Sequence, residues 1–168
     1  MSLTIPALTR RVVLPGIAVA FTSISAVTIA APATAATTVP LRAIFRTCDF
    51  TAVRSSGAAE SFGSVTAVVQ STGGSVSASV HISEPGTAGA HFDVALIQAP
   101  RASTLPCTAP GPGVAVGGLD LDGAGQGSAT VQTGRKSGTT GVWLFVQRPS
   151  PYSQSPAEYY TSDFIVPV

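Results

Sequence analysis

Two runs of alternating apolar and polar residues, joined by Gly73-Gly74, constrain this chain more than any other part of its sequence. A period of two residues is typical of a half-buried β-strand, and paired glycines between such runs favour a tight hairpin turn that needs positive φ. With the turn at these glycines, apolar residues face each other along both runs. The opposed pairs are Val65 and Ile82, Ala67 and Val80, and Val69 and Ala78. A slip of one residue would expose the whole apolar face, so the pattern determines the register.

A third alternating run, residues 90–98, follows a loop rich in turn-forming residues. A short connection would pair this run with the preceding one and set Val80 opposite Phe92. The three runs would then form a β-meander. The same register places His81 opposite His91 on its polar face.

The rest of the chain consists of short apolar runs separated by glycine, proline and serine. We expect further strands at 43–53, at 114–121 with a bulge at Gly117-Gly118, at 128–133 in a hairpin that sets Leu119 against Val131, at 142–146 with both faces covered, and from Thr161 onward. About eight short strands and no amphipathic helix after the leader predict an all-β fold. The specific prediction is a two-sheet antiparallel β-sandwich, immunoglobulin-like in architecture.

The N-terminal segment has the pattern of a signal peptide. Arg10 and Arg11 precede an apolar stretch, and Ala33-Thr34-Ala35 offers small residues for cleavage. A retained membrane anchor is the alternative for the apolar stretch. The paired arginines fit either twin-arginine export or an ordinary basic leader.

This pattern divides the chain into three parts. We expect a signal peptide at residues 1–36, a linker at 37–42 and the β-sandwich domain at 43–168. The mature protein would be secreted, either extracellular or held in the cell envelope.

Loss of the leader would leave a nearly neutral chain. The full sequence has nine lysines and arginines against eight acidic residues, and Arg10 and Arg11 lie in the leader. A neutral surface lacks the basic patch that binds nucleic acid or anionic lipid. We therefore expect no nucleic-acid partner, no stable membrane insertion after cleavage, and an unknown protein or glycan partner outside the membrane.

Cys48 and Cys107 are the two cysteines of the chain. In an exported protein such a pair predicts a disulfide, which here would tie the first strand to the Pro-rich segment at 99–113. Closing a loop of this length stabilises by about 4 kcal/mol in the chain-entropy model. A redox-active or metal-ligating thiol pair is less favoured, because the chain has no CxxC spacing.

His81, His91 and Asp93 form a candidate metal site on the predicted meander. Opposed imidazoles on neighbouring strands come close enough to share copper or zinc, and Asp93 could be a third ligand or orient one of the histidines. The alternative is an exposed polar face that carries both histidines of the chain.

Arg148, Tyr152, Tyr159 and Tyr160 form the main binding candidate, since all three tyrosines fall in one predicted loop. Tyr and Arg supply contact area and hydrogen bonds at low entropic cost. The alternative is that the tyrosines fold back onto the core.

Other motifs of known chemistry are incomplete. The run from Asp120 to Gly125 begins like a calcium loop, but Ala124 and Val131 stand where oxygen ligands are needed. No serine lies in a Gly-x-Ser-x-Gly motif, and no pair of acids is placed to face a cleft. We expect no catalytic residues and no cofactor.

Three segments of the C-terminal half carry a resemblance. They are Leu119-Asp-Leu-Asp-Gly-Ala-Gly-Gln-Gly-Ser-Ala-Thr-Val131, Val142-Trp-Leu-Phe145 and Tyr160-Thr-Ser-Asp-Phe164. Together they resemble small exported bacterial β-sandwich proteins, most of which have no assigned activity. The resemblance implies a fold and an extracellular location.

These observations favour an exported, non-catalytic binding or interaction module. A metal-binding accessory protein that uses His81 and His91 is the first alternative. A structural envelope protein is the second.

Overall fold

The computed structural model describes residues 36–54 and 62–168, which contain nine β-strands. The strands are β1 (Ala36–Arg42), β2 (Ser64–Thr72), β3 (Ser75–Ser83), β4 (His91–Ala99), β5 (Val114–Asp120), β6 (Gln126–Gly134), β7 (Gly141–Arg148), β8 (Glu158–Ser162) and β9 (Val166–Pro167). All strand pairs are antiparallel, so the prediction of an all-β antiparallel fold is confirmed. Within these two ranges no helix is long and apolar enough to cross a membrane. The predicted signal peptide lies outside the described residues, apart from Ala36.

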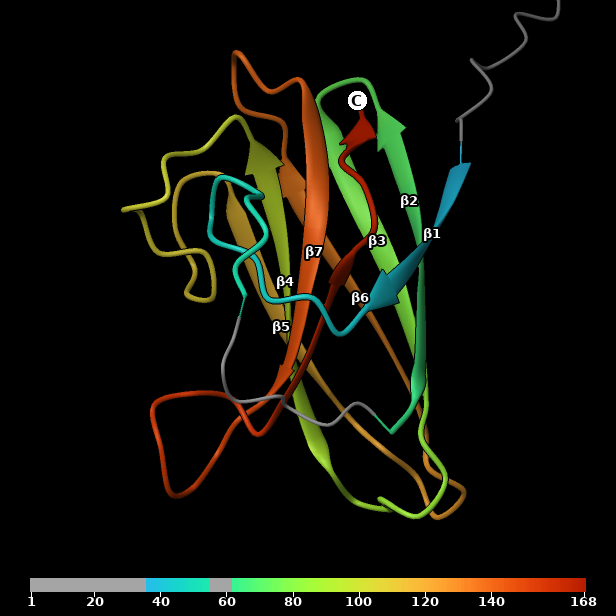
Figure 1. Ribbon diagram of the computed structural model, residues 1–168. Coiled ribbons are helices and arrows are strands. Elements are labelled where there is room, and N and C mark those ends of the chain that lie inside the picture. The colour runs from blue at the N-terminus through green and yellow to red at the C-terminus, as the bar shows by residue number, and fades with distance from the viewer. Residues whose placement is uncertain (1–35, 55–61) are drawn as a thin grey trace, which may run out of the picture. The chain divides into compact units, whose positions relative to one another are not determined.

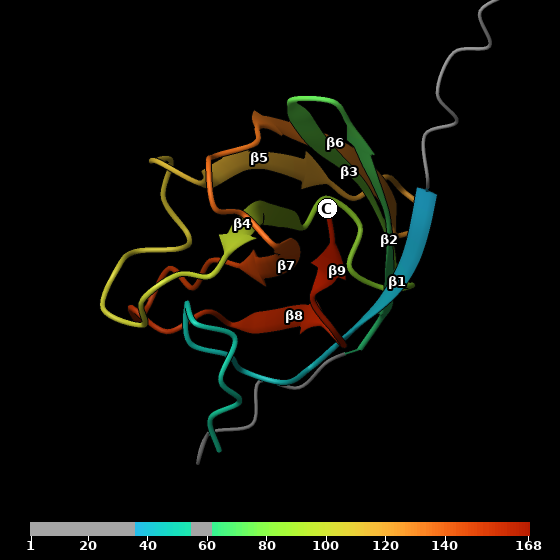
Figure 2. The same cartoon turned by 90° about the horizontal axis from the view of Figure 1, so that it is seen from above.

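The nine strands belong to one hydrogen-bonded sheet rather than to the two separate sheets that we expected. The order is β5-β4-β7-β8-β1-β2-β3-β6, and β9 adds to β7. Seen from above, the sheet curls until β5 and β6, its two edge strands, lie beside each other (Figure 2). The fold therefore has two facing walls, β5-β4-β7-β8 and β1-β2-β3-β6, around one interior (Figure 1).

Side chains from the inner faces of both walls fill this interior. Along β2 and β3 every second residue is buried, as expected for strands with one solvent-exposed face. The largest side chains of this core are those of Phe92, Ile82, Leu96, Leu144 and Tyr160. Each wall alone would leave its apolar face in water, so the curling of the sheet supplies the burial that stabilises it.

The β2–β3 hairpin has the predicted register. Val65 pairs with Ile82 and Ala67 with Val80. Gly73 has φ of 52°, in the left-handed region that the turn requires.

The predicted pairing of β3 with β4 is wrong. β3 pairs with β2 and β6, whereas β4 pairs with β5 and β7 in the opposite wall. Alternation determines which face of a strand is apolar but not which strand lies beside it. Val80 and Phe92 therefore share the interior without being cross-strand neighbours.

The predicted bulge at Gly117-Gly118 is also wrong, because β5 pairs with β4 without interruption from Val114 to Asp120. The apolar phase changes because different faces of β5 are covered along its length. Val114 packs on the outside of the sheet, whereas Leu119 points into the interior.

The expected β5–β6 hairpin is not a hydrogen-bonded pair. The turn between the strands is present, and Asp122 Oδ1 accepts hydrogen bonds from Ala124 N at 2.8 Å and Gln126 N at 2.9 Å. The strands beyond it are the two edges of the sheet and approach through side chains. A Cβ added to Gly117 would lie 2.8 Å from Val131 Cγ1, so this glycine permits the approach.

The N-terminal boundaries differ from those predicted. Residues 37–42 were expected to be a linker but form most of β1, where Val39 and Leu41 point into the interior. Residues 43–53 were expected to be the first strand but form a loop with one isolated bridge, between Arg46 and Ala52.

The last predicted strand is displaced as well. The chain is already extended at Glu158, and β8 ends at Ser162. A short interruption follows before β9 pairs with the start of β7. The strands number nine rather than eight because of this division, since β1 replaces the predicted strand at 43–53.

The outer face of β4, β7 and β8 carries a second apolar cluster. Its buried members are Ala95, Ile97, Ala99, Cys107, Val114, Trp143, Phe145 and Tyr159, and Phe45, Cys48, Phe50 and Ile165 pack on them. Most of this cover comes from the 43–53 and 100–113 loops. β7 is thus buried on both faces, as predicted from its unbroken apolar run.

Candidate functional site

The tyrosines predicted to form a binding surface are separated in the structure. Tyr152 is 95% exposed at the loop between β7 and β8. Tyr159 and Tyr160 belong to β8, and their side chains point to opposite faces of the sheet. Tyr160 is 1% exposed in the interior, and Tyr159 packs at 5.3 Å against Phe45 on the outer face. The alternative that the tyrosines pack onto the core therefore applies to two of the three.

Arg148, the fourth predicted binding residue, forms an ion pair with a buried acid. Its Nε lies 3.2 Å from Glu158 Oε2, and Glu158 is fully buried. Glu158 Oε1 accepts hydrogen bonds from the Tyr160 hydroxyl and from Phe62 N. Burial first, and then the hydrogen bond to Glu158, raises the pKa of Tyr160. Arg148 and Tyr160 thus pair with a buried acid of β8 and do not form one exposed surface with Tyr152.

Glu84 is a second fully buried acid at the same end of the sheet. Its backbone is well bonded, with N donating to Gly125 O at 2.8 Å, but neither carboxyl oxygen has a hydrogen-bond partner within the described ranges. Burial, followed by the charge of Glu158, raises the pKa of the Glu84 carboxyl. Folding therefore favours the protonated form of Glu84 relative to the unfolded chain.

Replacing Glu84 with glutamine should stabilise the protein at neutral pH. A carboxyl whose pKa is raised by folding contributes full stability below its ordinary range, and this contribution is lost as the pH rises through the raised pKa. Glutamine has nearly the same shape and never ionises, so at pH 7 we expect a gain on the order of 1 kcal/mol from removing a buried charge. Urea unfolding at pH 7 and pH 4 measures this gain, which should shrink at pH 4. An equal loss of stability at both pH values would contradict the assignment.

The predicted metal pair does not form, because His81 and His91 lie in different walls. His81 stands opposite Ser128 on β6, and its Nδ1 lies 3.0 Å from Ser128 Oγ. His91 stands opposite Asp120 on β5. The error follows directly from the wrong β3–β4 pairing.

His91 instead lies between two exposed carboxylates, those of Asp93 and Asp120. Its Nδ1 lies 2.7 Å from Asp120 Oδ1, and its Nε2 lies 3.5 Å from Asp93 Oδ1. The hydrogen bond to Asp120 is the largest cause of a raised His91 pKa. Each ring nitrogen already faces its own carboxylate, so the ring is not placed as a ligand. Across residues 36–54 and 62–168, no group of three His, Cys, Asp or Glu residues could hold a metal ion.

A pocket of about 350 Å³ lies on the outer face of the β7–β8 wall, and we call it the outer pocket. Its apolar lining is formed by Phe45, Phe145, Pro106, Pro156 and the disulfide. Hydroxyl and amide groups also line it, from Thr47, Ser103, Thr108, Gln147 and Gln154. An apolar floor with a few polar groups is the usual composition of a small-molecule site.

Gln147 belongs to this pocket because of the alternation along β7. Trp143, Phe145 and Gln147 share the outer face, and the first two are covered by the 43–53 loop. Gln147 lies beyond the part of β7 that the 43–53 loop covers, so its side chain lines the pocket. Gln154, from the loop that projects at the lower left in Figure 1, adds a second amide.

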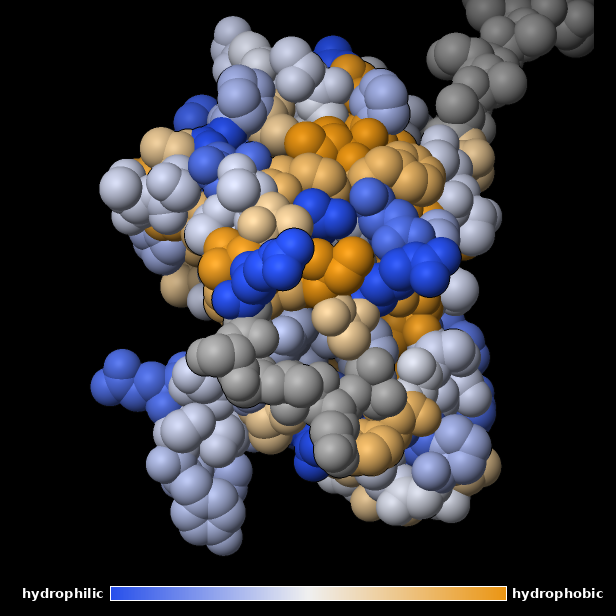
Figure 3. Space-filling model, in the orientation of Figure 1, coloured by the Kyte–Doolittle hydropathy of each residue, from blue (hydrophilic) through white to orange (hydrophobic). Residues whose placement is uncertain are grey.

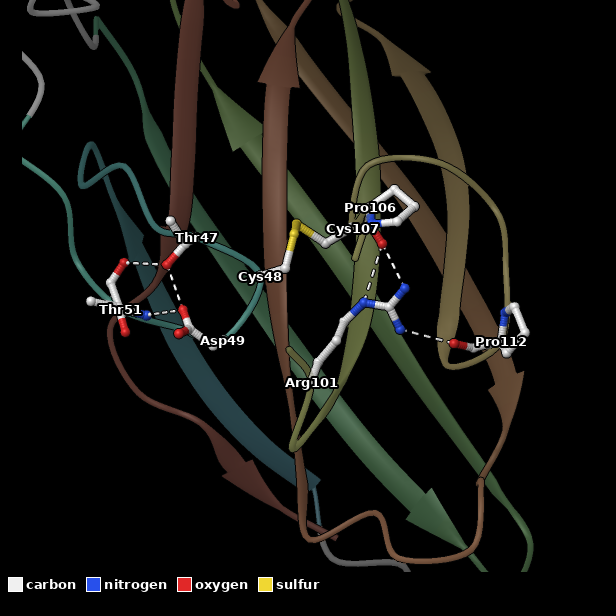
Figure 4. The surroundings of a disulfide bond; sticks show 8 residues. All are labelled: Thr47, Cys48, Asp49, Thr51, Arg101, Pro106, Cys107 and Pro112. Carbon is white, nitrogen blue, oxygen red and sulfur yellow. Dashed lines mark hydrogen bonds between the residues drawn. A yellow bond between two sulfur atoms is a disulfide. The ribbon is translucent and has the colours of Figure 1, made fainter. Parts of the chain in front are cut away.

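The predicted disulfide between Cys48 and Cys107 is confirmed, and it joins the two loops that border the outer pocket (Figure 4). In the first loop, Asp49 Oδ1 accepts hydrogen bonds from Thr47 Oγ1 at 2.5 Å and Thr51 N at 3.2 Å. These two bonds lower the pKa of Asp49, the bond from Thr47 most. The turn that carries Cys48 is therefore fixed by its own side chains.

In the second loop, the side chain of Arg101 fixes the backbone. Its guanidinium donates to Pro106 O through Nε at 3.1 Å and Nη2 at 2.6 Å, and to Pro112 O through Nη1 at 2.9 Å. Proline-rich loops leave many carbonyls without partners, and one arginine here satisfies two of them. Both loops are thus held in place before any ligand arrives.

Arg46 is the charged residue of the outer pocket. Its guanidinium lies 4.0 Å above the Phe50 ring, and Nη1 donates to Phe50 O at 3.1 Å. Its Nε is buried and has no hydrogen-bond partner within the described residues. An unpaired buried donor is costly, and stacking of the guanidinium on the Phe50 ring offsets part of that cost.

Our sequence predictions missed the outer pocket. They placed Phe45 in a strand and gave Gln147 and Gln154 no role. The one available signal is Gln147, a polar residue that ends the apolar run of β7 on the same face as Phe145.

In the orientation of Figure 1, the molecular surface shows apolar areas interrupted by strongly hydrophilic side chains (Figure 3). Comparison with protein-family models, with curated proteins and with solved structures finds no match to this chain.

Proposed function

We propose that this protein is an exported, non-catalytic binding module that holds a short neutral glycan segment in the outer pocket. The observation that carries the proposal is the pocket itself. It has an apolar floor, a rim of amides and hydroxyls, and two bordering loops fixed by a disulfide. Preorganised loops lose little entropy on binding, so even a small pocket can hold a ligand usefully.

The polar groups of the pocket suit a sugar better than an ion. The amides of Gln147 and Gln154 both donate and accept hydrogen bonds, as sugar hydroxyls do. Phe45 offers an aromatic surface to the apolar face of a sugar ring.

Export is part of the proposal. The leader pattern at residues 1–36 and the Cys48–Cys107 disulfide both support it, since disulfides persist in oxidising compartments. The resemblance to small exported β-sandwich proteins agrees with this location. Two walls that face each other across one apolar interior are a feature that this fold shares with a sandwich.

A set of neutral saccharides tests the proposal. We expect at least one of glucose, galactose, N-acetylglucosamine, cellobiose and maltose to bind the mature protein, measured by saturation-transfer NMR and titration. Gln147→Ala should weaken the best binder about fivefold, since one hydrogen bond contributes about 1 kcal/mol.

Gln132→Ala is the matched control. Gln132 is an exposed glutamine of β6 that does not line the outer pocket, so its loss should leave the affinity within about twofold of the wild type. The proposal fails if none of the five saccharides binds, or if both variants weaken binding equally.

A further inference from the structure

A second pocket, of about 230 Å³, lies where the loops after β4 and β6 meet, and we call it the end pocket. The residues that matter here are Gln98, Arg101, Gly113, Lys136, Ser137 and Thr139. Arg101 and Gly113 belong to the 100–113 loop that also borders the outer pocket, but none of these six residues lines that pocket. The end pocket is therefore a separate site.

A buried glutamine, Gln98, positions the loop that lines the end pocket. Gln98 is 4% exposed, and its Nε2 donates to Gly134 O at 2.8 Å. Its Oε1 accepts from Lys136 N at 2.8 Å and from Thr139 Oγ1 at 2.6 Å. One side chain thus fixes both ends of the 135–139 loop and sets where Lys136 emerges.

Two basic side chains border this pocket. Arg101 Nη1 and Lys136 Cδ each lie 3.6 Å from the position that a Cβ on Gly113 would occupy. Arg101 donates once through each of its three nitrogens, so one N–H group on each Nη is left for another acceptor. Gly113 is needed here because its φ of 79° is left-handed.

No acidic residue of the described chain lines the end pocket. Among the residues that the structure describes, Arg42, His91 and Arg148 form ion pairs, whereas Arg101 and Lys136 do not. Within the described residues, both basic side chains therefore border the pocket without an acidic partner. An oxyanion between them would supply a counter-charge and accept charge-assisted hydrogen bonds.

We propose that the end pocket binds a small tetrahedral oxyanion, a phosphate or sulfate group, between Arg101 and Lys136. Ser137 borders the same space and supplies a hydroxyl for another of its oxygens, whereas the Thr139 hydroxyl already donates to Gln98 Oε1. A free ion and an ester on a larger molecule both fit this description, because both present the same charged oxygens. This site is independent of the glycan proposal and would stand without it.

Titration with inorganic phosphate at constant ionic strength tests the site. We expect saturable shifts in the ¹⁵N–¹H spectrum of the mature protein at the amides of Gly113, Ser137 and Thr139. Lys136→Gln should weaken binding at least fivefold. Arg135→Gln, the same charge change one residue earlier at a position that does not line the pocket, should stay within about twofold.

Shifts that rise linearly without saturation, shifts of equal size with chloride, or equal weakening by both variants would overturn the site. A parallel titration with glucose 1-phosphate identifies the source of the group. Saturable shifts at the same amides support an ester ligand, and their absence, with phosphate still binding, supports a free ion.

Discussion

Replacing both Cys48 and Cys107 with serine is expected to lower the free energy of unfolding by about 4 kcal/mol. The cysteines are 59 residues apart, so the bond removes much freedom from the unfolded chain. The bond also joins the two loops that cover Trp143 and Phe145 on the outer face of β7. Urea unfolding of the oxidised wild type and the double variant measures the difference.

Reduction of the wild type provides an independent check on this result. Wild type with its disulfide reduced should match the double variant within about 1 kcal/mol, because both lack the same cross-link. A loss of less than about 1 kcal/mol in either case would mean that the two loops stay in place without the bond. The disulfide would then have no structural role in the outer pocket.

The second large effect is expected from Gly125→Ala, in the turn between β5 and β6. A Cβ at this position would lie 2.1 Å from Glu84 O, and the residue has φ of +74°. Left-handed backbone costs alanine about 1–2 kcal/mol, and overpacking against backbone adds about 1–3 kcal/mol. We therefore expect a loss of about 2–5 kcal/mol in the free energy of unfolding, measured by urea denaturation.

Gly123→Ala is the matched control in the same turn. No atom lies within 4 Å of its Cβ position, and its φ is outside the left-handed region. Its stability should change by less than about 1 kcal/mol in either direction. Equal losses in the two variants would show that the contact between Gly125 and Glu84 is not what constrains the turn.

The parts of the fold that could be predicted from the sequence are those determined locally. The β2–β3 hairpin follows from Gly73-Gly74 and from alternation on both sides, which agree on one register. The double-faced burial of β7 follows from its unbroken apolar run. The disulfide follows from an even cysteine count.

The parts that were missed depend on contacts between distant segments. Alternation in β3 and β4 assigns their apolar faces but cannot show that β6 lies beside β3. The linker prediction failed because Thr37 to Arg42 carry only two buried side chains, Val39 and Leu41, and become a strand by pairing with β2. One continuous sheet was missed because its order joins β8 to β1 across most of the chain.

Two predicted groupings of site residues do not form, for the same physical reason. His81 and His91 were brought together by a strand pairing that does not occur. Tyr159 and Tyr160 were assigned to a loop, whereas pairing with β7 draws them into a strand and buries both. The outer pocket depends on two loops meeting over β7, which no local pattern encodes.

A crystal structure of the mature protein with the tightest-binding saccharide tests the central claim most directly. We expect the sugar in the outer pocket, with its hydroxyls on Gln147 and Gln154 and its ring against Phe45. A sugar seated on the exposed Tyr152, or on the face of β3 that carries His81, would contradict the account.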